Sequence, residues 1–143
     1  MATWEKQFEV LSNILTDKGI GGFWGSGIRI KDRDFANASL EDADQRVGMA
    51  MQKLSDEGLV PQDDYAANGA DCDNWAGWIW AEVSKQWAKE HEGQESYPAY
   101  PLGSAWQPGH EFNCGVFDGQ VHTWNYGQRV EWDLNKIKEV EFK

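Results

Sequence analysis

The sequence lacks any apolar run close to the roughly 18 residues that a membrane-spanning helix needs. Its start, MATWEKQFEVL, lacks the basic-then-apolar plan of a secretory signal peptide, so we expect a cytoplasmic protein. Cysteine is scarce as well, with only 2 in the chain. In a reducing compartment a disulfide between Cys72 and Cys114 is not expected, although two cysteines allow one.

Basic residues are also few. The 13 lysines and arginines face 24 aspartates and glutamates, which leaves a net charge of -11. Such a chain would repel nucleic-acid phosphates and anionic membrane surfaces, so neither nucleic acid nor membrane is expected as a partner. An acidic inhibitor that imitates nucleic acid is one class of protein that this charge leaves open.

The length suits a single domain, 1–143, with one core to which most of the 9 tryptophans should contribute. Apolar residues recur with a helical period over 3–18 and 39–57, and a third helix fits 72–89. A short strand is expected in GIGGFWGSGIRI. The proline- and glycine-containing stretch 92–109 is interpreted as a loop.

The last third of the chain has strand patterns. HEFNCGVF and QVHTWN flank an Asp-Gly pair, which predicts a β-hairpin with a two-residue turn and places Cys114 opposite Thr123. NYGQ is a second turn, and RVEWDL and IKEVEF are further expected strands. A helical part of about 1–92 followed by an antiparallel sheet of about 106–143 is an α+β order.

Cys72 is the most informative residue for function, because it directly follows Asp71, the expected N-cap of the third helix. The unpaired backbone N–H groups and the positive dipole end at a helix start favour a thiolate. The charges of Asp71 and Asp73 oppose it, so a nearby cation is also needed. A histidine is the usual source of that cation.

The hairpin register selects His110 from the three histidines. Alternation places His110, Phe112 and Cys114 on one strand face, and Asn125 on the neighbouring strand points to the same face. The diagonal pair is about 7–8 Å apart between Cα atoms, within side-chain reach. His110 would hold the Cys72 thiolate and protonate a leaving group, while Asn125 would orient the ring.

The segments ADCDNWA and GHEFNCGVFDGQVHTWN resemble the papain-like superfamily of thiol hydrolases. They are most similar to the small transglutaminase-like cysteine peptidases found in phage and bacterial proteins and appended to a fungal agglutinin. The resemblance covers about residues 59–126 and implies that Cys72 is the nucleophile, His110 the base and Asn125 the third member of a triad. The family more often has glutamate there, commonly followed by proline; here Asn125-Tyr126 stands instead, as in amidase relatives that cleave bacterial cell walls.

Three polar residues near Cys72 have secondary roles in this interpretation. Asn68 would donate to an oxyanion beside the Cys72 backbone N–H, with a plain turn residue as the alternative. Asp71 is expected as a helix cap. With Asp73 it would alternatively help to hold a divalent cation, as in some relatives of this type. No organic cofactor is implied, and no recognised ligand spacing supports a metal site built from the histidines and cysteines.

Two tryptophans flank the expected site in sequence. Trp106 and Trp124 are the candidates for a substrate wall, with core burial as the alternative for both. The expected register points Trp124 to the face opposite the proposed site, which weakens its candidacy. Cys114 is expected to be a core strand residue, and His122 to be solvated or packed on the sheet.

The sequence therefore predicts an α+β domain with a papain-like or transglutaminase-like core, in which helices pack on an antiparallel sheet. Its expected activity is acyl transfer from an amide through a thioester on Cys72, using a Cys-His-Asn triad. The amide would belong to a peptide, a peptidoglycan stem or a glutamine-containing protein, and the residues leave the three open. A catalytically inactive binding or accessory protein of phage or bacterial origin is the first alternative, and an acidic anti-defence inhibitor is the second.

Overall fold

The computed structural model of the chain describes residues 2–3, 28–30, 34–59, 71–131, 137 and 139–142. The strands in these ranges form a six-stranded sheet in the order β2-β8-β4-β5-β6-β7 and a separate two-stranded sheet, β1-β3. The elements are β1 Ala2–Thr3, β2 Ile28–Ile30, β3 Asp34–Phe35, α2 Leu40–Asp56, α4 Cys72–Glu90, β4 Leu102–Gln107, β5 His110–Phe117, β6 Gln120–Asn125, β7 Gln128–Val130 and β8 Glu139–Phe142.

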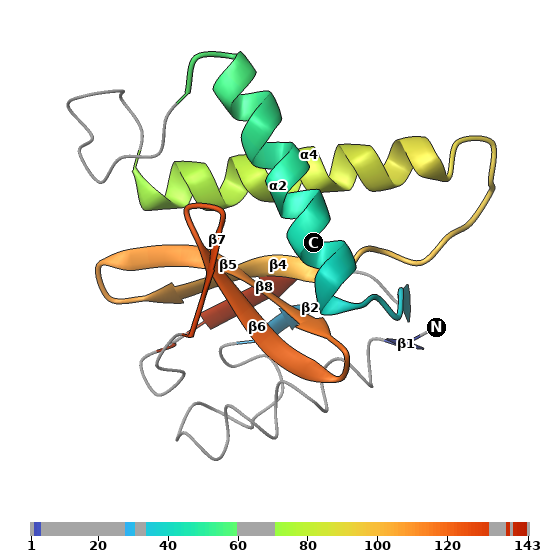
Figure 1. Cartoon of the computed structure of the whole chain (residues 1–143). Helices are drawn as coiled ribbons and strands as arrows, with labels where there is room; N and C mark the ends of the chain where they lie inside the picture. The colour runs from blue at the N-terminus through green and yellow to red at the C-terminus, as the bar shows by residue number, and fades with distance from the viewer. Residues whose placement is uncertain are drawn as a thin grey trace.

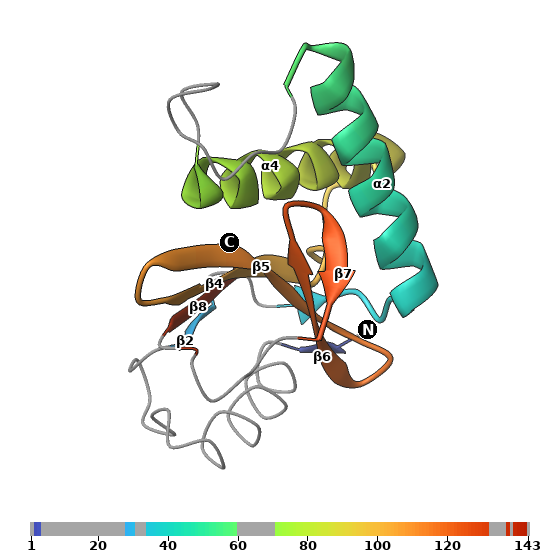
Figure 2. The same cartoon turned by 60° about the vertical axis from the view of Figure 1, so that its left-hand side comes forward.

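Both helices lie on the same face of the larger sheet, with α2 crossing over α4 (Figure 1), and the same layering is visible after a rotation (Figure 2). From β8 to β7 all neighbouring strands are antiparallel, while β2 pairs with β8 in parallel at the edge. The expected α+β class, with helices packed on an antiparallel sheet, is therefore confirmed.

Helix α2 matches the expected helix over 39–57. Ser39 is its N-cap, and the Ser39 Oγ accepts a hydrogen bond of 3.0 Å from the backbone N–H of Asp42. Gly58 follows the helix with a φ of +87°, a conformation that favours glycine. The residues that face the core recur every three or four positions, which is the period of one helix face: Ala43, Val47, Ala50 and Leu54.

Helix α4 matches the expected helix over 72–89. Its N-cap is Asp71, in an extended conformation, and the Asn74 Oδ1 accepts a hydrogen bond of 3.1 Å from the backbone N–H of Asp71. Because this bond fixes the chain where it enters the helix, the position of Cys72 follows from the cap. The buried residues of α4 form the stripe that contacts β5 and α2: Trp75, Ala76, Ile79, Glu82 and Val83.

The hairpin of β5 and β6 has the expected register. Cys114 pairs with Thr123, and the turn consists of Asp118 and Gly119 with φ values of 53° and 74°. Two positive φ values are those of the type I′ turn, whose twist matches that of the strands. Since the turn has two residues and no bulge, the alternation that places His110 and Asn125 on one face is retained.

Strand β4 corrects the interpretation of 92–109 as a loop. Leu102–Gln107 lies inside the sheet and pairs with both β5 and β8. The sheet therefore begins before the predicted boundary at residue 106. A turn of Pro108 and Gly109, with Gly109 at a φ of +83°, joins β4 to β5. Pro108 and Gly109 form only the hairpin turn. The prediction was wrong because it treated the whole proline- and glycine-containing stretch, including β4, as a loop.

The division into a helical part and a sheet part is also incomplete. Strand β2, from the expected helical part, pairs with β8, so Ile28 lies beside Val140 in the same sheet. This strand falls in GIGGFWGSGIRI, where a short strand was expected. The expected helix over 3–18 lies outside the described residues except for Thr3, which belongs to β1. Parts of RVEWDL and IKEVEF form β7 and β8.

The larger sheet has buried side chains on both faces. On the helix side, Trp124, Phe117 and Leu102 pack with the stripes of α2 and α4. On the opposite face, a second set is buried that the strand register brings together: Ala105, Phe112, Cys114, Val140 and Phe142. Within the ranges that the structure describes, no helix is long and apolar enough to span a bilayer.

Candidate functional site

The Cys72 sulfur lies where α4 begins and contacts the start of β5. The thiol is half-buried, and its Sγ accepts a hydrogen bond of 3.3 Å from the backbone N–H of Glu111. Glu111 directly follows His110, so the sulfur is held beside the residue whose imidazole was selected from the sequence. An N–H donor at sulfur stabilises a thiolate more than a thiol, because the bond to the charged acceptor is stronger.

His110 and Asn125 are in contact. The His110 Nε2 and the Asn125 Oδ1 are 2.7 Å apart. Because an amide oxygen only accepts hydrogen bonds, Nε2 carries a proton in this arrangement, and Nδ1 is the ring nitrogen left to act as a base. The expected hydrogen bond between strands β5 and β6 is therefore present, and it fixes the tautomer and the plane of the ring.

Aromatic rings enclose the imidazole. The His110 ring stacks on Phe112, with centroids 5.9 Å apart, and lies 6.1 Å from the ring of Tyr126. Tyr126 in turn contacts Trp75 of α4, edge to face, at 6.3 Å. The turn after β6 thus connects the histidine to the helix that carries Cys72. Tyr126 has a φ of 49° and precedes Gly127, so the ring is held by a tight turn.

Asp71 and Asp73 form a pair of carboxylates at the helix start. A hydrogen bond that the protonated Asp71 carboxyl group donates to the Asp73 carboxylate raises the pKa of Asp71, and partial desolvation and the repulsion of the Asp73 charge act in the same direction. Negative charge is therefore concentrated beside Cys72. Across the described part of the chain, no three histidine, cysteine, aspartate or glutamate residues gather in a way that would hold a metal ion.

The two tryptophans proposed as a substrate wall differ in exposure. Trp106 on β4 is 44% exposed, so it is available to a ligand. Trp124 is 1% exposed and its Nε1 donates a hydrogen bond of 3.0 Å to the Asp44 Oδ1 on α2. As a wall residue Trp124 is wrong, because strand alternation turns it into the core between the sheet and the helices.

The remaining predicted residues are placed as follows. Asn68 lies outside the described residues. Cys114 is fully buried in β5, and burial raises the pKa of its thiol far above the ordinary range. His122 is half-buried on β6, opposite Gly115. Both cysteines are free thiols.

Sequence reasoning missed a buried amide that joins the helix to the sheet. Asn113 is 1% exposed, and its Nδ2 donates to the backbone oxygens of Ala76 at 2.9 Å and Gly103 at 3.2 Å. It therefore ties the first turns of α4 to β5 and β4. A polar residue at an inward-facing position of HEFNCGVF was the available signal.

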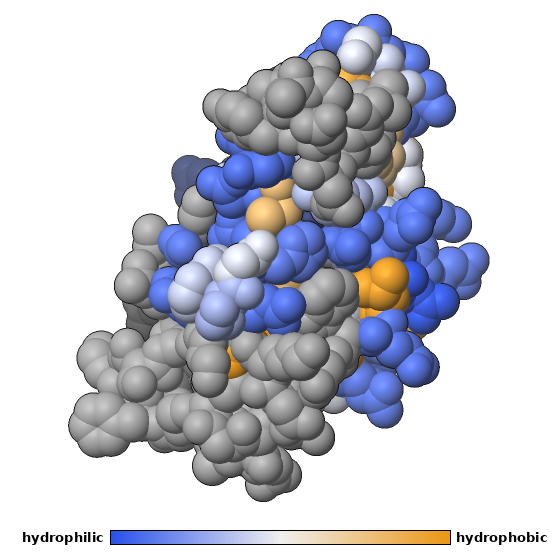
Figure 3. Space-filling view, turned by 90° about the vertical axis from the view of Figure 1, so that its left-hand side faces the viewer, coloured by the Kyte–Doolittle hydropathy of each residue, from blue (hydrophilic) through white to orange (hydrophobic). Residues whose placement is uncertain are grey.

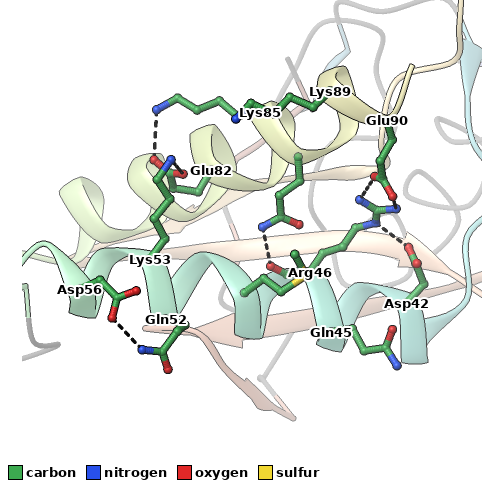
Figure 4. Close-up of a pocket in the computed structure, with 12 residues that line it drawn as sticks. Asp42, Gln45, Arg46, Gln52, Lys53, Asp56, Glu82, Lys85, Lys89 and Glu90 are labelled. Atoms are coloured by element: carbon green, nitrogen blue, oxygen red, sulfur yellow. Dashed lines mark hydrogen bonds and ion pairs between the residues drawn. The ribbon is translucent and has the colours of Figure 1, made fainter. Parts of the chain in front are cut away.

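A groove lies between α2 and α4 (Figure 4). Its volume is about 680 Å³. Buried Glu82 is held there by Lys53 at 3.3 Å and Lys85 at 3.1 Å, and Arg46 pairs with Asp42 and Glu90. Because Lys53 and Arg46 of α2 pair with Glu82 and Glu90 of α4 and so hold the two helices together, we interpret the groove as structural.

Figure 3 shows the end of the molecule at which α4 begins. The described residues there are mostly hydrophilic, with small hydrophobic areas between them.

The comparisons with known proteins show the fold. No family model and no curated protein matches the chain. A solved structure described as the "PSL1a-E64 complex" matches with a TM-score of 0.64 and 15% identity over 98% of this chain and 50% of that one. A crystal structure of Polyporus squamosus lectin bound to the human-type influenza-binding epitope Neu5Aca2-6Galb1-4GlcNAc matches with a TM-score of 0.62 and 14% identity, over 94% and 48% of the two chains. The chain spans about half the length of either protein.

Proposed function

We propose that the protein is a thiol-dependent amide hydrolase or acyltransferase of the papain-like or transglutaminase-like type, with Cys72, His110 and Asn125 as its triad. The observation that carries this proposal is the geometry at the joint of α4 and β5. The Cys72 sulfur is bound by the N–H of Glu111, and the adjacent His110 is oriented by Asn125 at 2.7 Å. A nucleophile, an imidazole on the residue next to its hydrogen-bond donor and a group that orients the imidazole are the parts from which an acyl-transfer site is built.

The reaction follows from these positions. The Nδ1 of His110 takes the thiol proton, and the Cys72 sulfur attacks the carbonyl carbon of an amide. The tetrahedral intermediate collapses to a thioester as the C–N bond breaks, and the imidazolium returns the proton to the departing amine. Water or a second amine then attacks the thioester, His110 takes the proton from it, and the thiol is released with that proton.

The substrate would be an amide in a peptide, in a peptidoglycan stem or in a glutamine side chain. A solved structure with the same fold is described as a complex with E64, and the match covers 50% of that chain. E-64 is an epoxide, and a thiolate opens an epoxide by attack on a ring carbon, which leaves a thioether and a hydroxyl group. The compound is therefore a direct probe for Cys72.

The experiment is mass spectrometry of the intact protein with E-64 at neutral pH. We expect one adduct, on Cys72, that is absent in Cys72→Ala, unchanged in Cys114→Ala and slowed in His110→Ala. The urea-unfolded protein is the control, because it reports the intrinsic rate of an ordinary cysteine. A folded-state rate at Cys72 no higher than the unfolded rate would contradict the proposal.

A glycan-binding role without catalysis is the second candidate, and one observation favours it: a protein of the same fold is described as a lectin bound to a sialylated trisaccharide. The match covers only 48% of that lectin, so the glycan site of the longer protein need not lie in the matched half. Binding of that trisaccharide by the Cys72→Ala variant, with no turnover of any amide by the native protein, would favour this role.

A further inference from the structure

Trp106 occupies an unusual position for a tryptophan, because it is exposed between two acidic neighbours. Its cross-strand partners are Glu111 on β5 and Glu139 on β8. Directly paired residues of neighbouring strands point to the same face of a sheet, with Cβ atoms about 4.5–5.5 Å apart. One indole is thus flanked on both sides by a carboxylate.

This trio lies on the helix side of the sheet, next to the start of α4. Glu111 and Asn113 are two residues apart on β5 and share a face, and Asn113 bonds to Ala76 of α4. The N–H of the same Glu111 donates to the Cys72 sulfur at 3.3 Å. The Cys72 sulfur therefore contacts β5, and Trp106 lies on β4, the neighbouring strand.

An exposed indole beside two carboxylates is suited to an organic cation. The face of tryptophan attracts an ammonium or guanidinium group, with about 0.5–1 kcal/mol at exposed sites. The carboxylates add attraction at short range, and a carboxylate keeps its charge when it also accepts other hydrogen bonds. Asp71 and Asp73 flank Cys72 in the chain and add two further acidic groups at the start of α4.

We propose that Trp106, Glu111 and Glu139 form a subsite beside Cys72 that binds the side chain of a lysine or arginine in the substrate, adjacent to the amide that is attacked. This inference rests on the proposed function and specifies its substrate class. A calcium ion fits the trio less well, because it requires six to eight oxygen ligands and an indole supplies none.

The groove between α2 and α4 provides the contrast. It is also rich in carboxylates, but Lys53, Lys85 and Arg46 already pair with them, and no aromatic ring is among its lining residues. The groove therefore offers a cation no aromatic face, whereas Trp106 does, so cation binding should depend on this trio and not on the overall charge of -11.

The first test compares two thiol reagents that differ only in charge, chloroacetyl-lysine amide and chloroacetyl-norleucine amide. In each case the Cys72 sulfur displaces chloride and forms a thioether. We expect the lysine reagent to label Cys72 about tenfold faster at low salt, after division by the ratio measured on the urea-unfolded protein. The preference should fall toward one in Trp106→Leu, Glu111→Gln and Glu139→Gln, and also with added salt.

Glu92→Gln is the matched control, since Glu92 is exposed and follows the far end of α4. A helix of 19 residues separates it from Cys72, which is about 28 Å at 1.5 Å per residue. If Glu92→Gln lowers the preference as much as Glu111→Gln does, the attraction comes from the net charge and the subsite is wrong.

The second test does not need a reactive thiol. In the Cys72→Ala variant, the indole N–H resonance of Trp106, assigned by its loss in Trp106→Leu, is followed during titration with acetyl-lysine methylamide or acetyl-norleucine methylamide. Movement with the lysine compound alone supports the subsite, even if Cys72 proves unreactive and the proposed function fails. Equal movement with both compounds, or none with either, overturns the subsite even if Cys72 is a nucleophile.

Discussion

The two cysteines of this chain are a comparison within one molecule, because strand β5 contacts both. Cys72 lies at the start of α4 and receives a hydrogen bond from the N–H of Glu111, near the first residue of the strand. Cys114 lies in the same strand, fully buried and paired between Gly103 and Thr123. One thiol is at a junction of elements and the other is inside a sheet.

The difference shows that the reactivity of a cysteine in this chain depends on whether it lies at the start of a helix or inside a strand. A helix start has backbone N–H groups without partners, and these stabilise negative charge. A strand interior has none to offer, since the ladder uses them all, and burial raises the pKa of the Cys114 thiol by disfavouring its charged form. The same side chain is therefore a candidate nucleophile at one position and a packing group at the other.

The largest expected effect is on the rate of alkylation. Iodoacetamide should label Cys72 about 10³-fold faster than Cys114 in the folded protein at neutral pH, because Cys114 reacts only through an opening that costs about 5 kcal/mol or more. Peptide mapping after timed quenching measures both rates. In urea the two rates should converge, and equal slow labelling in the folded state would remove the distinction between the two sites.

Serine at the same two positions should affect stability unequally. Cys114→Ser buries a hydroxyl group in an apolar layer beside Phe112, and we expect it to lower the free energy of unfolding by about 1–3 kcal/mol. Cys72→Ser places the hydroxyl at a half-exposed helix start, where serine is well tolerated, and should change it by less than about 0.5 kcal/mol. Urea denaturation followed by tryptophan fluorescence measures both, and a larger loss at Cys72 would contradict this assignment of environments.

Sequence alone predicted a large share of this arrangement. The spacing of apolar residues located α2 and α4, and the Asp-Gly turn fixed the register that brings His110 to Asn125. These features depend on local rules of period and turn geometry. Strand β4 was missed because it lies in a segment with prolines and glycines and has no special composition of its own; its place in the sheet comes from pairing with β5 and β8.

Other parts of the site depend on tertiary contacts that leave little trace in the sequence. The donor to the Cys72 sulfur is a backbone N–H, which every residue other than proline has, so no side chain indicated Glu111. The burial of Trp124 against Asp44 likewise requires knowing that α2 crosses that part of the sheet. Local patterns predicted the elements, and the contacts between elements determined which side chains are available.

Removing the group that orients the histidine should have a moderate effect on one thiol only. Asn125→Ala deletes the acceptor for the His110 Nε2–H, and we expect Cys72 labelling to slow about five- to tenfold, which corresponds to the net contribution of one hydrogen bond, about 1–1.4 kcal/mol. Asn125→Asp retains an acceptor and should restore most of the rate. The rate at Cys114 is the internal control; slowing of both thiols, or no rescue by aspartate, would exclude an orienting role.

The smallest expected effect concerns the acidic pair at the start of α4. Because the pKa of Asp71 is raised in the folded protein, mainly by Asp73, the folded state favours the protonated form, and the stability this provides is present at low pH and lost as pH rises through the raised value. Asp71→Asn keeps that position neutral and still able to cap, so the melting temperature of the variant should exceed that of the native protein slightly at pH 7, with the difference vanishing near pH 3.

The same substitution removes a negative charge beside Cys72. Because a neighbouring negative charge disfavours the thiolate, alkylation of Cys72 should accelerate modestly, about threefold, while Cys114 is unaffected. A slower reaction at Cys72 would contradict this expectation and would mean that the Asp71 carboxylate assists the thiol.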